Sequence, residues 1–366
     1  MVTTRSMKGE QKPEPTRSTV GEQKPELRTY RGNCHCGAFV YEVELPEIKS
    51  VLECNCSICH KKGYLWVFPA EGRFDIVKGT DDTLTRYTFG PKKLTHRVRT
   101  PPRRAPTPWH DAYGFAVLPD LCHPCHGGIR RRQQASLQRE LARSSPISGK
   151  RMLTGALARF ALYRVSTAGC WRSNRKSCIG IDRGLALTNK RYDGAALGDE
   201  YVPPEHKGPL PAAIDGHELY TGSCHCGAVT LAFMSKKLDE TFTDLTCECN
   251  CSICGRNGYR WTYPSNKRVV LFAGDPAHLG RYSFARHVLN KTFCRICGVC
   301  MTNEYSNITD EERKALGALP ARGFANSMKT QHPVNLRVFP DVDLDNLKPP
   351  KLNDGAKIIS PRYVNP

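Results

Sequence analysis

A six-residue motif, CNCSIC, occurs twice in this chain, at residues 54–59 and again at residues 249–254. The sequence around it is also repeated. Upstream, GNCHCGAFVYEV (32–43) matches GSCHCGAVTLAF (222–233), and downstream LTRYTFG (84–90) matches LGRYSFA (279–285). Because order, spacing and aromatic positions agree, the chain is a tandem duplication. We therefore expect two copies of one domain, each built around its cysteines.

The composition agrees with two domains inside the cell. The 366 residues are enough for two cores, and no apolar run is long enough to cross a membrane. The first residues lack the apolar core of a secretory signal, so we expect a cytoplasmic protein, with the nucleus as the alternative. In such a compartment the 18 cysteines would stay reduced or bind metal, whereas disulfides would require secretion.

The first copy departs from the second after residue 98. In the second copy, Cys294 follows Cys254 by 40 residues, but Arg99 stands 40 residues after Cys59. There the chain enters a segment, residues 99–177, with 13 arginines and 2 lysines against 3 acidic residues, which accounts for +12 of the net charge of +19. We interpret it as a late insertion or translated non-coding sequence that displaced the closing thiol pair. Alternatively, Cys122 and Cys125 within this segment replace the missing closing pair.

Recognisable sequence returns near residue 178, where YDGA (192–195) resembles NDGA (353–356). The first 27 residues contain GEQKPE twice and are predicted to be a disordered tail. We expect a first domain at 28–207, interrupted at about 99–177, a linker at 208–216, and an intact second domain at 217–363.

Period-two alternation predicts strands in both copies, so each copy is expected to be a small, mainly antiparallel β domain. The predicted strands are 38–45, 63–69, 73–78, 83–89, 228–234, 259–263, 268–273 and 280–285. One helix is predicted after Thr309, because Glu312 three residues later completes a capping box. Asn335 and Arg337 lie on a further predicted strand, where the arginine would grip a carboxylate of a ligand or form a surface ion pair.

Four thiols of the second copy have the spacing of a closed zinc site. Zinc takes four tetrahedral ligands, and both Cys-x-Cys followed by glycine and Cys-x-x-Cys supply two from one turn. Such a shell leaves no vacancy, so its role would be structural. The four ligands are Cys224, Cys226, Cys294 and Cys297, and Cys34 and Cys36 are the first copy's half of the same set.

The CNCSIC loops differ, because each supplies three thiols and then ends. Three protein ligands and an open fourth position are the arrangement of a catalytic zinc. A thiol bound there would be deprotonated and nucleophilic. Cys247 is the alternative fourth ligand, although Leu52 replaces it in the first copy. The loop thiols are Cys249, Cys251 and Cys254 in the second copy, and Cys54, Cys56 and Cys59 in the first.

Other repeated residues receive simpler interpretations. His35 and His225, each between two predicted ligands, are expected to be turn residues, and Cys300 a core thiol. The aromatic pairs are expected to pack in the core, with the lining of a substrate cleft as the alternative. These pairs are Tyr64 with Trp66 and Tyr259 with Trp261.

The motifs Gly-x-Cys-His-Cys-Gly, Cys-x-Cys-x-x-Cys and Phe-Cys-x-x-Cys-Gly, in this order, resemble the glutathione-dependent formaldehyde-activating enzyme family, which includes centromere protein V. The resemblance covers 216–363 and, in broken form, 28–98 and 178–207. It implies two tandem Mss4-like (β-tent) domains with two zinc ions per intact domain. It also implies a carbon–sulfur lyase that interconverts glutathione, formaldehyde and S-hydroxymethylglutathione.

Two functions of different class follow. As an enzyme, the chain would act on glutathione adducts or small aldehydes at an open zinc, with no membrane partner. As a binding module, it would be a zinc-stabilised domain for nucleic acid, chromatin or protein. Most of the net charge lies in residues 99–177, which favours the enzyme. Salt-sensitive nucleic-acid binding by protein lacking that segment would favour the module.

Overall fold

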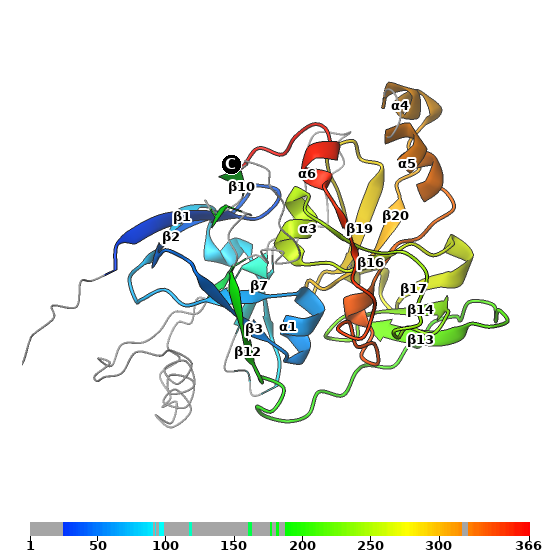
Figure 1. Cartoon of the computed structure of the whole chain (residues 1–366), viewed down its shortest axis with the longest axis horizontal. Helices are drawn as coiled ribbons and strands as arrows, with labels where there is room; N and C mark the ends of the chain where they lie inside the picture. The colour runs from blue at the N-terminus through cyan, green and yellow to red at the C-terminus, as the bar shows by residue number, and fades with distance from the viewer. Residues whose placement is uncertain are drawn as a thin grey trace, which may run out of the picture.

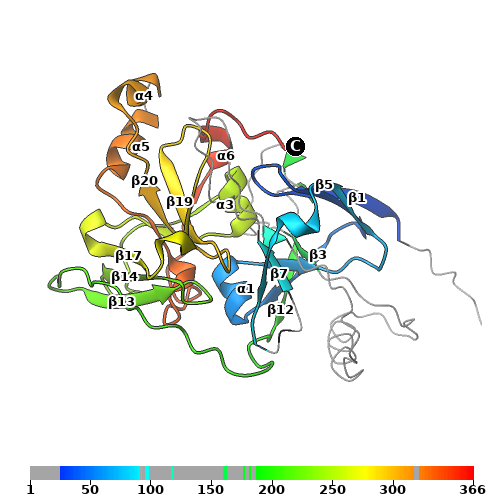
Figure 2. The same ribbon diagram turned by 180° about the vertical axis from the view of Figure 1, so that it is seen from behind.

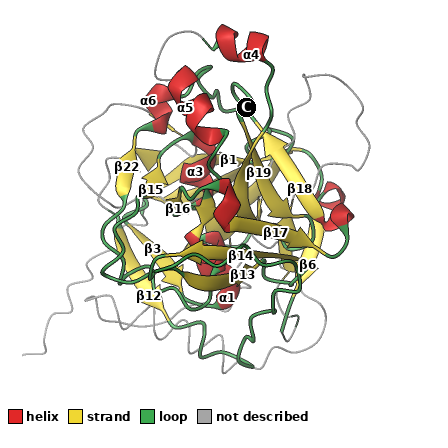
Figure 3. Ribbon diagram, turned by 90° about the vertical axis from the view of Figure 1, so that its right-hand side faces the viewer, coloured by secondary structure: helices red, strands yellow, loops and turns green. Residues whose placement is uncertain are grey.

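The computed structural model describes residues 25–90, 92, 95–98, 187–316 and 321–366, and four short strand segments at 117–118, 160–162, 176–177 and 181–182. Within these residues the chain is mainly β, arranged as several small sheets with short helices (Figures 1 and 3). The predicted fold class is confirmed at this level. Most of the predicted tail and of segment 99–177, including Cys122 and Cys125, lies outside the described residues.

Each repeat begins with a three-stranded antiparallel sheet of the same design. In the first repeat the order is β1-β2-β5, and in the second it is β13-β14-β17. The outer and middle strands form a hairpin whose turn is the Cys-His-Cys-Gly sequence. The strands are β1 (Leu27–Asn33), β2 (Val40–Pro46), β5 (Phe74–Lys78), β13 (Glu218–Ser223), β14 (Val229–Ser235) and β17 (Val269–Ala273).

A second sheet in each repeat carries the CNCSIC loop. In the second repeat seven strands lie in the order β18-β19-β20-β21-β16-β15-β22. These are β15 (Thr246–Cys249), β16 (Trp261–Thr262), β18 (Leu279–Ser283), β19 (Leu289–Cys294), β20 (Cys300–Tyr305), β21 (Val334–Asn335) and β22 (Lys351–Asn353).

The corresponding strands of the first repeat form two smaller sheets, with orders β12-β3-β4-β9 and β6-β7-β8, and β10 pairs with β11. They are β3 (Ser50–Cys54), β4 (Leu65–Val67), β6 (Thr85–Thr88), β7 (Thr95–Val98), β8 (Val117–Leu118), β9 (Phe160–Leu162), β10 (Lys176–Ser177), β11 (Ile181–Asp182) and β12 (Thr188–Tyr192).

Strand β12 pairs in parallel with β3, as β22 pairs with β15. The chain that follows the Arg-rich segment therefore completes the sheet that the chain before it began. This matches the predicted correspondence between YDGA and NDGA.

The eight strands predicted by alternation all contain a strand in the structure, with ends that differ by at most two residues. The predicted capping box is also confirmed: Thr309 Oγ1 accepts from the Glu312 amide, and Glu312 accepts from the Thr309 amide. That helix is α4 (Asp310–Ala315), followed by α5 (Ala321–Met328) and α6 (Gly355–Ile358). Short 3-10 turns lie at Asp81–Thr83, Asn266–Arg268, Pro276–His278 and Leu336–Val338.

Besides α5 and α6, two further described helices were not predicted from the sequence. The second half of each CNCSIC motif begins a six-residue helix, α1 (Ser57–Lys62) and α3 (Ser252–Asn257). Each ends at a glycine, Gly63 or Gly258, with φ near +60°. Neither helix has an N-cap side-chain hydrogen bond, so the usual start signal is absent from the sequence.

The two repeats are packed against each other (Figures 1 and 2), with α1 and α3 toward the middle of the molecule. The largest core cluster contains Ile58 and Tyr87 of the first repeat together with Val229, Leu231 and Phe339 of the second. The C-terminal residues cross back to the first repeat, where Tyr363 stacks on His35. None of the helices in the described ranges has the length and apolar character needed to span a bilayer.

Candidate metal centres

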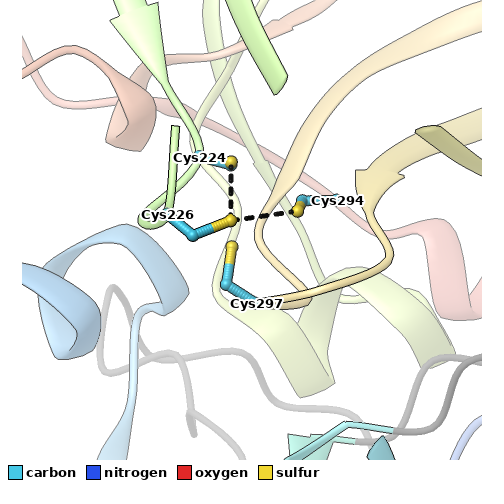
Figure 4. A group of neighbouring side chains, drawn as sticks. All are labelled: Cys224, Cys226, Cys294 and Cys297. Carbon is cyan, nitrogen blue, oxygen red and sulfur yellow. Dashed lines mark hydrogen bonds between the residues drawn. The ribbon is translucent and has the colours of Figure 1, made fainter. Parts of the chain in front are cut away.

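Four cysteines of the second repeat meet at one point (Figure 4). Cys224 and Cys226 lie in the turn after β13, Cys294 ends β19, and Cys297 lies in the turn before β20. All four sulfurs lie within 4.8 Å of one another, with Cys226 Sγ at 3.6 Å from Cys224 Sγ and 3.5 Å from Cys294 Sγ. Tetrahedral zinc with bonds near 2.3 Å would space its sulfurs by about 3.8 Å. The four thiols fit such an ion.

The backbone prepares these sulfurs to carry negative charge. The amide of Val229 donates to Cys224 Sγ at 3.3 Å, and the amide of Ile296 donates to Cys294 Sγ at 3.4 Å. Hydrogen bonds from Cys224 and Cys294 lower the pKa of Cys226. A hydrogen bond with Cys226 raises the pKa of Cys224. Hydrogen bonds among the four thiols thus lower some of their pKa values and raise others, and a divalent ion would favour the charged form of all four.

Each CNCSIC loop forms a three-thiol centre. The three sulfurs of each loop lie within 4.8 Å of one another, and no further histidine, cysteine or carboxylate of the described residues belongs to either group. In the second repeat Cys249 ends β15, Cys251 is the N-cap of α3, and Cys254 lies in the first turn of α3. The strand-to-helix turn brings the thiols together, and the same turn recurs between β3 and α1.

A glycine covers one side of each three-thiol centre. A Cβ on Gly355 would lie 2.4 Å from Cys249 Sγ, and a Cβ on Gly194 would lie 2.4 Å from Cys54 Sγ. The glycine is held by the loop asparagine: Asn250 Nδ2 donates to Asp354 Oδ1 at 2.8 Å. No side chain larger than hydrogen fits at these positions, which explains the shared Asp-Gly-Ala sequence.

The first repeat holds its glycine through equivalent bonds. Asn55 Nδ2 donates to Asp193 Oδ1 at 2.8 Å, and the Ala195 amide donates to Asn55 Oδ1 at 2.9 Å. The Ala356 amide makes the matching 2.9 Å bond to Asn250 Oδ1.

Aromatic side chains lie against both three-thiol centres. Trp66 Nε1 donates to Cys59 Sγ at 3.2 Å, and Trp66 packs on Tyr64 with ring centroids 5.3 Å apart. In the second repeat Trp261 and Tyr259 pack in the same way, with centroids 4.9 Å apart, and both are buried. The predicted core packing therefore holds, and the tryptophan of the first repeat also contacts a loop sulfur.

The second repeat adds a buried cation beside its three-thiol centre. Lys291 Nζ lies 4.4 Å from the Trp261 ring centroid and donates to Asn303 Oδ1 at 2.8 Å. Hydrogen bonds from Cys249 and Cys251, with the Lys291 charge adding to them, hold the pKa of Cys254 well below its usual value.

The corresponding residue of the first repeat is His96, paired with Tyr87 as Lys291 is with Tyr282. Burial lowers the pKa of His96 to about 3, so this side chain is neutral at physiological pH.

The remaining cysteines lie outside these groups. Cys247 Sγ accepts from Asn353 Nδ2 at 2.9 Å and is not a fourth member of the three-thiol group. Cys300 is buried in the core beside Tyr259, as predicted for a core thiol. In the first repeat Cys34 and Cys36 lie with their sulfurs 3.3 Å apart, and no described residue completes a metal group there.

The histidines of the Cys-His-Cys turns have a larger role than the turn residues that we expected. His35 lies across the repeat boundary, where Nδ1 bonds Tyr282 Oη at 2.6 Å and Nε2 bonds Ser252 Oγ at 2.8 Å. Ser252 is the serine of the second CNCSIC loop. His35 therefore contacts the three-thiol loop of the other repeat.

The contact is reciprocal. His225 Nδ1 bonds Tyr87 Oη at 2.6 Å, and His225 Nε2 bonds Ser57 Oγ at 2.9 Å. Tyr201 stacks on His225 at 4.6 Å, as Tyr363 stacks on His35 at 4.4 Å. The repeats are thus related by a local pseudo-twofold arrangement in which each Cys-His-Cys turn supports the other repeat's loop.

The prediction for Asn335 and Arg337 was wrong in its local structure. The strand ends at Asn335, Arg337 lies in a 3-10 turn, and the guanidinium is buried. Arg337 Nε donates to the Gly258 carbonyl at 2.6 Å and Nη1 to the His60 carbonyl at 3.3 Å. The arginine thus links the C-terminal ends of α1 and α3 rather than lying on the surface.

No family model matches this chain. Among solved structures it is similar to a crystal structure of a Rhodobacter sphaeroides protein from a structural genomics programme, at 22% identity and a TM-score of 0.27. The match covers 36% of this chain and 99% of that protein. The cysteine geometry therefore carries the functional argument.

Proposed function

We propose that this chain is a zinc-dependent enzyme of the carbon–sulfur lyase type, which acts on thiol adducts of small aldehydes at the three-thiol centre of the second repeat. The proposal includes two tandem Mss4-like domains with the boundaries given above. The observation that carries it is the contrast within one repeat between a four-thiol group and a three-thiol group. Four thiols close the coordination shell of zinc, whereas three leave a position for a ligand from solution.

The donor set favours zinc over other common ions. Every member of both groups is a cysteine, and soft thiolate ligands select zinc or iron–sulfur chemistry over magnesium or calcium. When bound at the three-thiol centre, zinc would supply a Lewis acid that keeps a substrate thiol deprotonated at neutral pH.

The reaction itself requires the formation or cleavage of one carbon–sulfur bond and the transfer of one proton between sulfur and oxygen. In the synthetic direction the thiol sulfur bonds to the carbonyl carbon, the carbonyl π pair moves to oxygen, and the proton lost from sulfur ends on that oxygen. In the lyase direction the carbon–sulfur bond breaks and the same proton returns. Glutathione with formaldehyde is the substrate pair suggested by the family resemblance.

The chain's own residues would support this chemistry through electrostatics and exclusion of water. Trp261 and Tyr259 form an apolar wall beside the centre, and Lys291 places a positive charge against that wall. In such a low-dielectric site a fixed cation stabilises negative charge on sulfur or oxygen more than it would in water. We assign Lys291 as the positioning cation of the second repeat's centre.

Exchange spectroscopy on mixtures of glutathione and formaldehyde tests the proposal, because it measures adduct formation and breakdown at equilibrium. The zinc-loaded chain is expected to accelerate exchange, and Cys251→Ala is expected to abolish that acceleration. Cys300→Ala is the matched control, because Cys300 is an equally buried thiol of the same core cluster outside every metal group. Zinc-loaded protein that accelerates neither this exchange nor that of other thiol–aldehyde pairs would refute the catalytic assignment.

A further inference from the structure

Helix α1 of the first repeat reaches the four-thiol centre of the second. Lys61 Nζ donates at 3.0 Å to the carbonyl of Ser223, the residue before Cys224, and at 3.0 Å to the carbonyl of Val338. Lys61 is only 4% exposed. A buried ammonium held by two backbone carbonyls of the other repeat is costly unless a negative charge lies nearby.

The next residue, Lys62, also indicates a negative charge at the four-thiol centre. It is 6% exposed, and its Nζ has no hydrogen-bond partner among the described residues. A Cβ built on Gly298, the residue after Cys297, would lie 2.8 Å from Lys62 Nζ. The ammonium thus lies against the turn that carries the Cys294 and Cys297 thiols, and the glycine leaves room for it. Lys62 Nζ also lies 5.8 Å from the centroid of the Tyr64 ring, but no described residue offers it a hydrogen-bond acceptor, so its position favours an anion at the adjacent thiols.

Charge arithmetic identifies that anion. Four thiolates around one divalent ion carry a net charge of −2, and Lys61 and Lys62 together carry +2. The two buried lysines therefore balance the charge of the loaded centre in full.

The other half of the pseudo-twofold arrangement provides an internal comparison. Arg256 occupies the place of Lys61 and donates to Asn33 Oδ1 at 3.4 Å, next to Cys34. Asn257 stands in the place of Lys62 and donates to the Ile253 carbonyl of its own helix. One cation therefore faces the first repeat's pair, Cys34 and Cys36, whereas two face the second repeat's four thiols. The number of cations follows the number of thiols described on each side.

From these contacts we infer that metal loading of the second repeat's four-thiol centre is coupled to docking of the first repeat, with Lys61 and Lys62 of α1 as its charge-balancing cations. The first repeat then serves as a part of the second repeat's metal site. This inference rests on the metal-binding part of the proposed function and is independent of the lyase activity.

The test replaces both lysines by methionine in the full chain (K61M/K62M), which keeps length and removes charge. Cadmium-loaded protein is challenged with a chelator, and cadmium NMR separates the four-thiolate signal from the three-thiolate signals. The four-thiolate signal is expected to disappear about 10- to 100-fold faster than in the wild type, the range found for groups around a metal's ligands. Arg256→Met is the matched control and should leave that rate unchanged.

A second readout separates charge from packing. In metal-free, reduced protein the two buried ammonium groups carry a desolvation cost, which K61M/K62M removes. The variant is therefore expected to raise or preserve the melting temperature while it weakens metal retention. A loss of packing would instead lower both quantities. The inference is overturned if the four-thiolate signal decays at the wild-type rate, or if metal-free stability falls in parallel with retention. Protein that takes up no metal at the four thiols would remove the inference together with the proposed zinc site, whereas normal loading without turnover would remove only the lyase.

Discussion

The two repeats preserve one cysteine site almost without change and differ in the other. Their three-thiol loops agree in fine detail: in each, a glycine Cβ would lie 2.4 Å from the first sulfur, and an asparagine–aspartate bond measures 2.8 Å. At the opposite site the second repeat brings four thiols together, whereas only Cys34 and Cys36 of the first are described there. The comparison teaches that the loop is held in the same way in both repeats by its own neighbours, Asp-Gly-Ala and the aromatic pair.

The largest effect is expected when the closing pair is removed from the second repeat, because its cysteine site then resembles that of the first. Cys294→Ala with Cys297→Ala is expected to lose one metal ion and several kcal/mol in the free energy of unfolding, because a structural zinc contributes its binding energy to folding. Native mass spectrometry counts the bound metal ions, and thermal unfolding measures the loss of stability. Cys300→Ala, three residues further along at the start of β20, is the control, and equal losses in the two variants would argue that packing rather than metal explains the effect.

The cation beside the second three-thiol centre is the next difference to test. Lys291→Met is expected to weaken metal binding at that centre by about 10- to 100-fold, because the variant leaves the thiolates without their nearby positive charge. The first repeat's loop, where neutral His96 occupies this place, should be unaffected. Chelator competition followed by cadmium NMR reports both loops, and exposed Lys314→Met is the control. Equal effects on both loops would contradict the assignment.

The reciprocal histidines predict effects that cross the repeat boundary. His35→Ala should disturb the loop of the second repeat, and His225→Ala the loop of the first, because each ring bonds the other repeat's serine and tyrosine. Each loss should cost about 1–3 kcal/mol in the free energy of unfolding, as expected when buried polar groups lose their partners. Cadmium NMR shows which loop responds. A response confined to the mutated repeat would be evidence against the cross-supported arrangement.

Buried His96 is expected to make the stability of the first repeat fall at acidic pH. Burial lowers its pKa to about 3, so the folded protein holds it neutral while the unfolded chain gains a proton below about pH 6.5. Stability from this group is complete above pH 6.5 and falls as pH drops toward 3, by at most about 1.4 kcal/mol per pH unit. In metal-free, reduced protein His96→Gln should flatten the pH dependence of unfolding by up to one proton. An unchanged slope would contradict the buried, neutral histidine.

The sequence predicted the parts of this molecule that depend on local pattern. Alternation located the strands, the Thr309 box located α4, and cysteine spacing grouped the thiols that the structure brings within 4.8 Å. Helices α1 and α3 escaped because they have no capping side chain, whereas α4, which is also six residues long, has a capping box. Cross-repeat contacts escaped for another reason. His35 and Lys61 carry no local signal, since their partners lie 217 and 162 residues away.

The most direct test of this account is the number of zinc ions retained by the native, reduced full-length chain, measured by native mass spectrometry. The three cysteine groups predict three ions, one in the four-thiol centre and one in each three-thiol loop. Folded, reduced protein that carries no zinc would contradict the account, as would cysteines that prove to be oxidised in pairs.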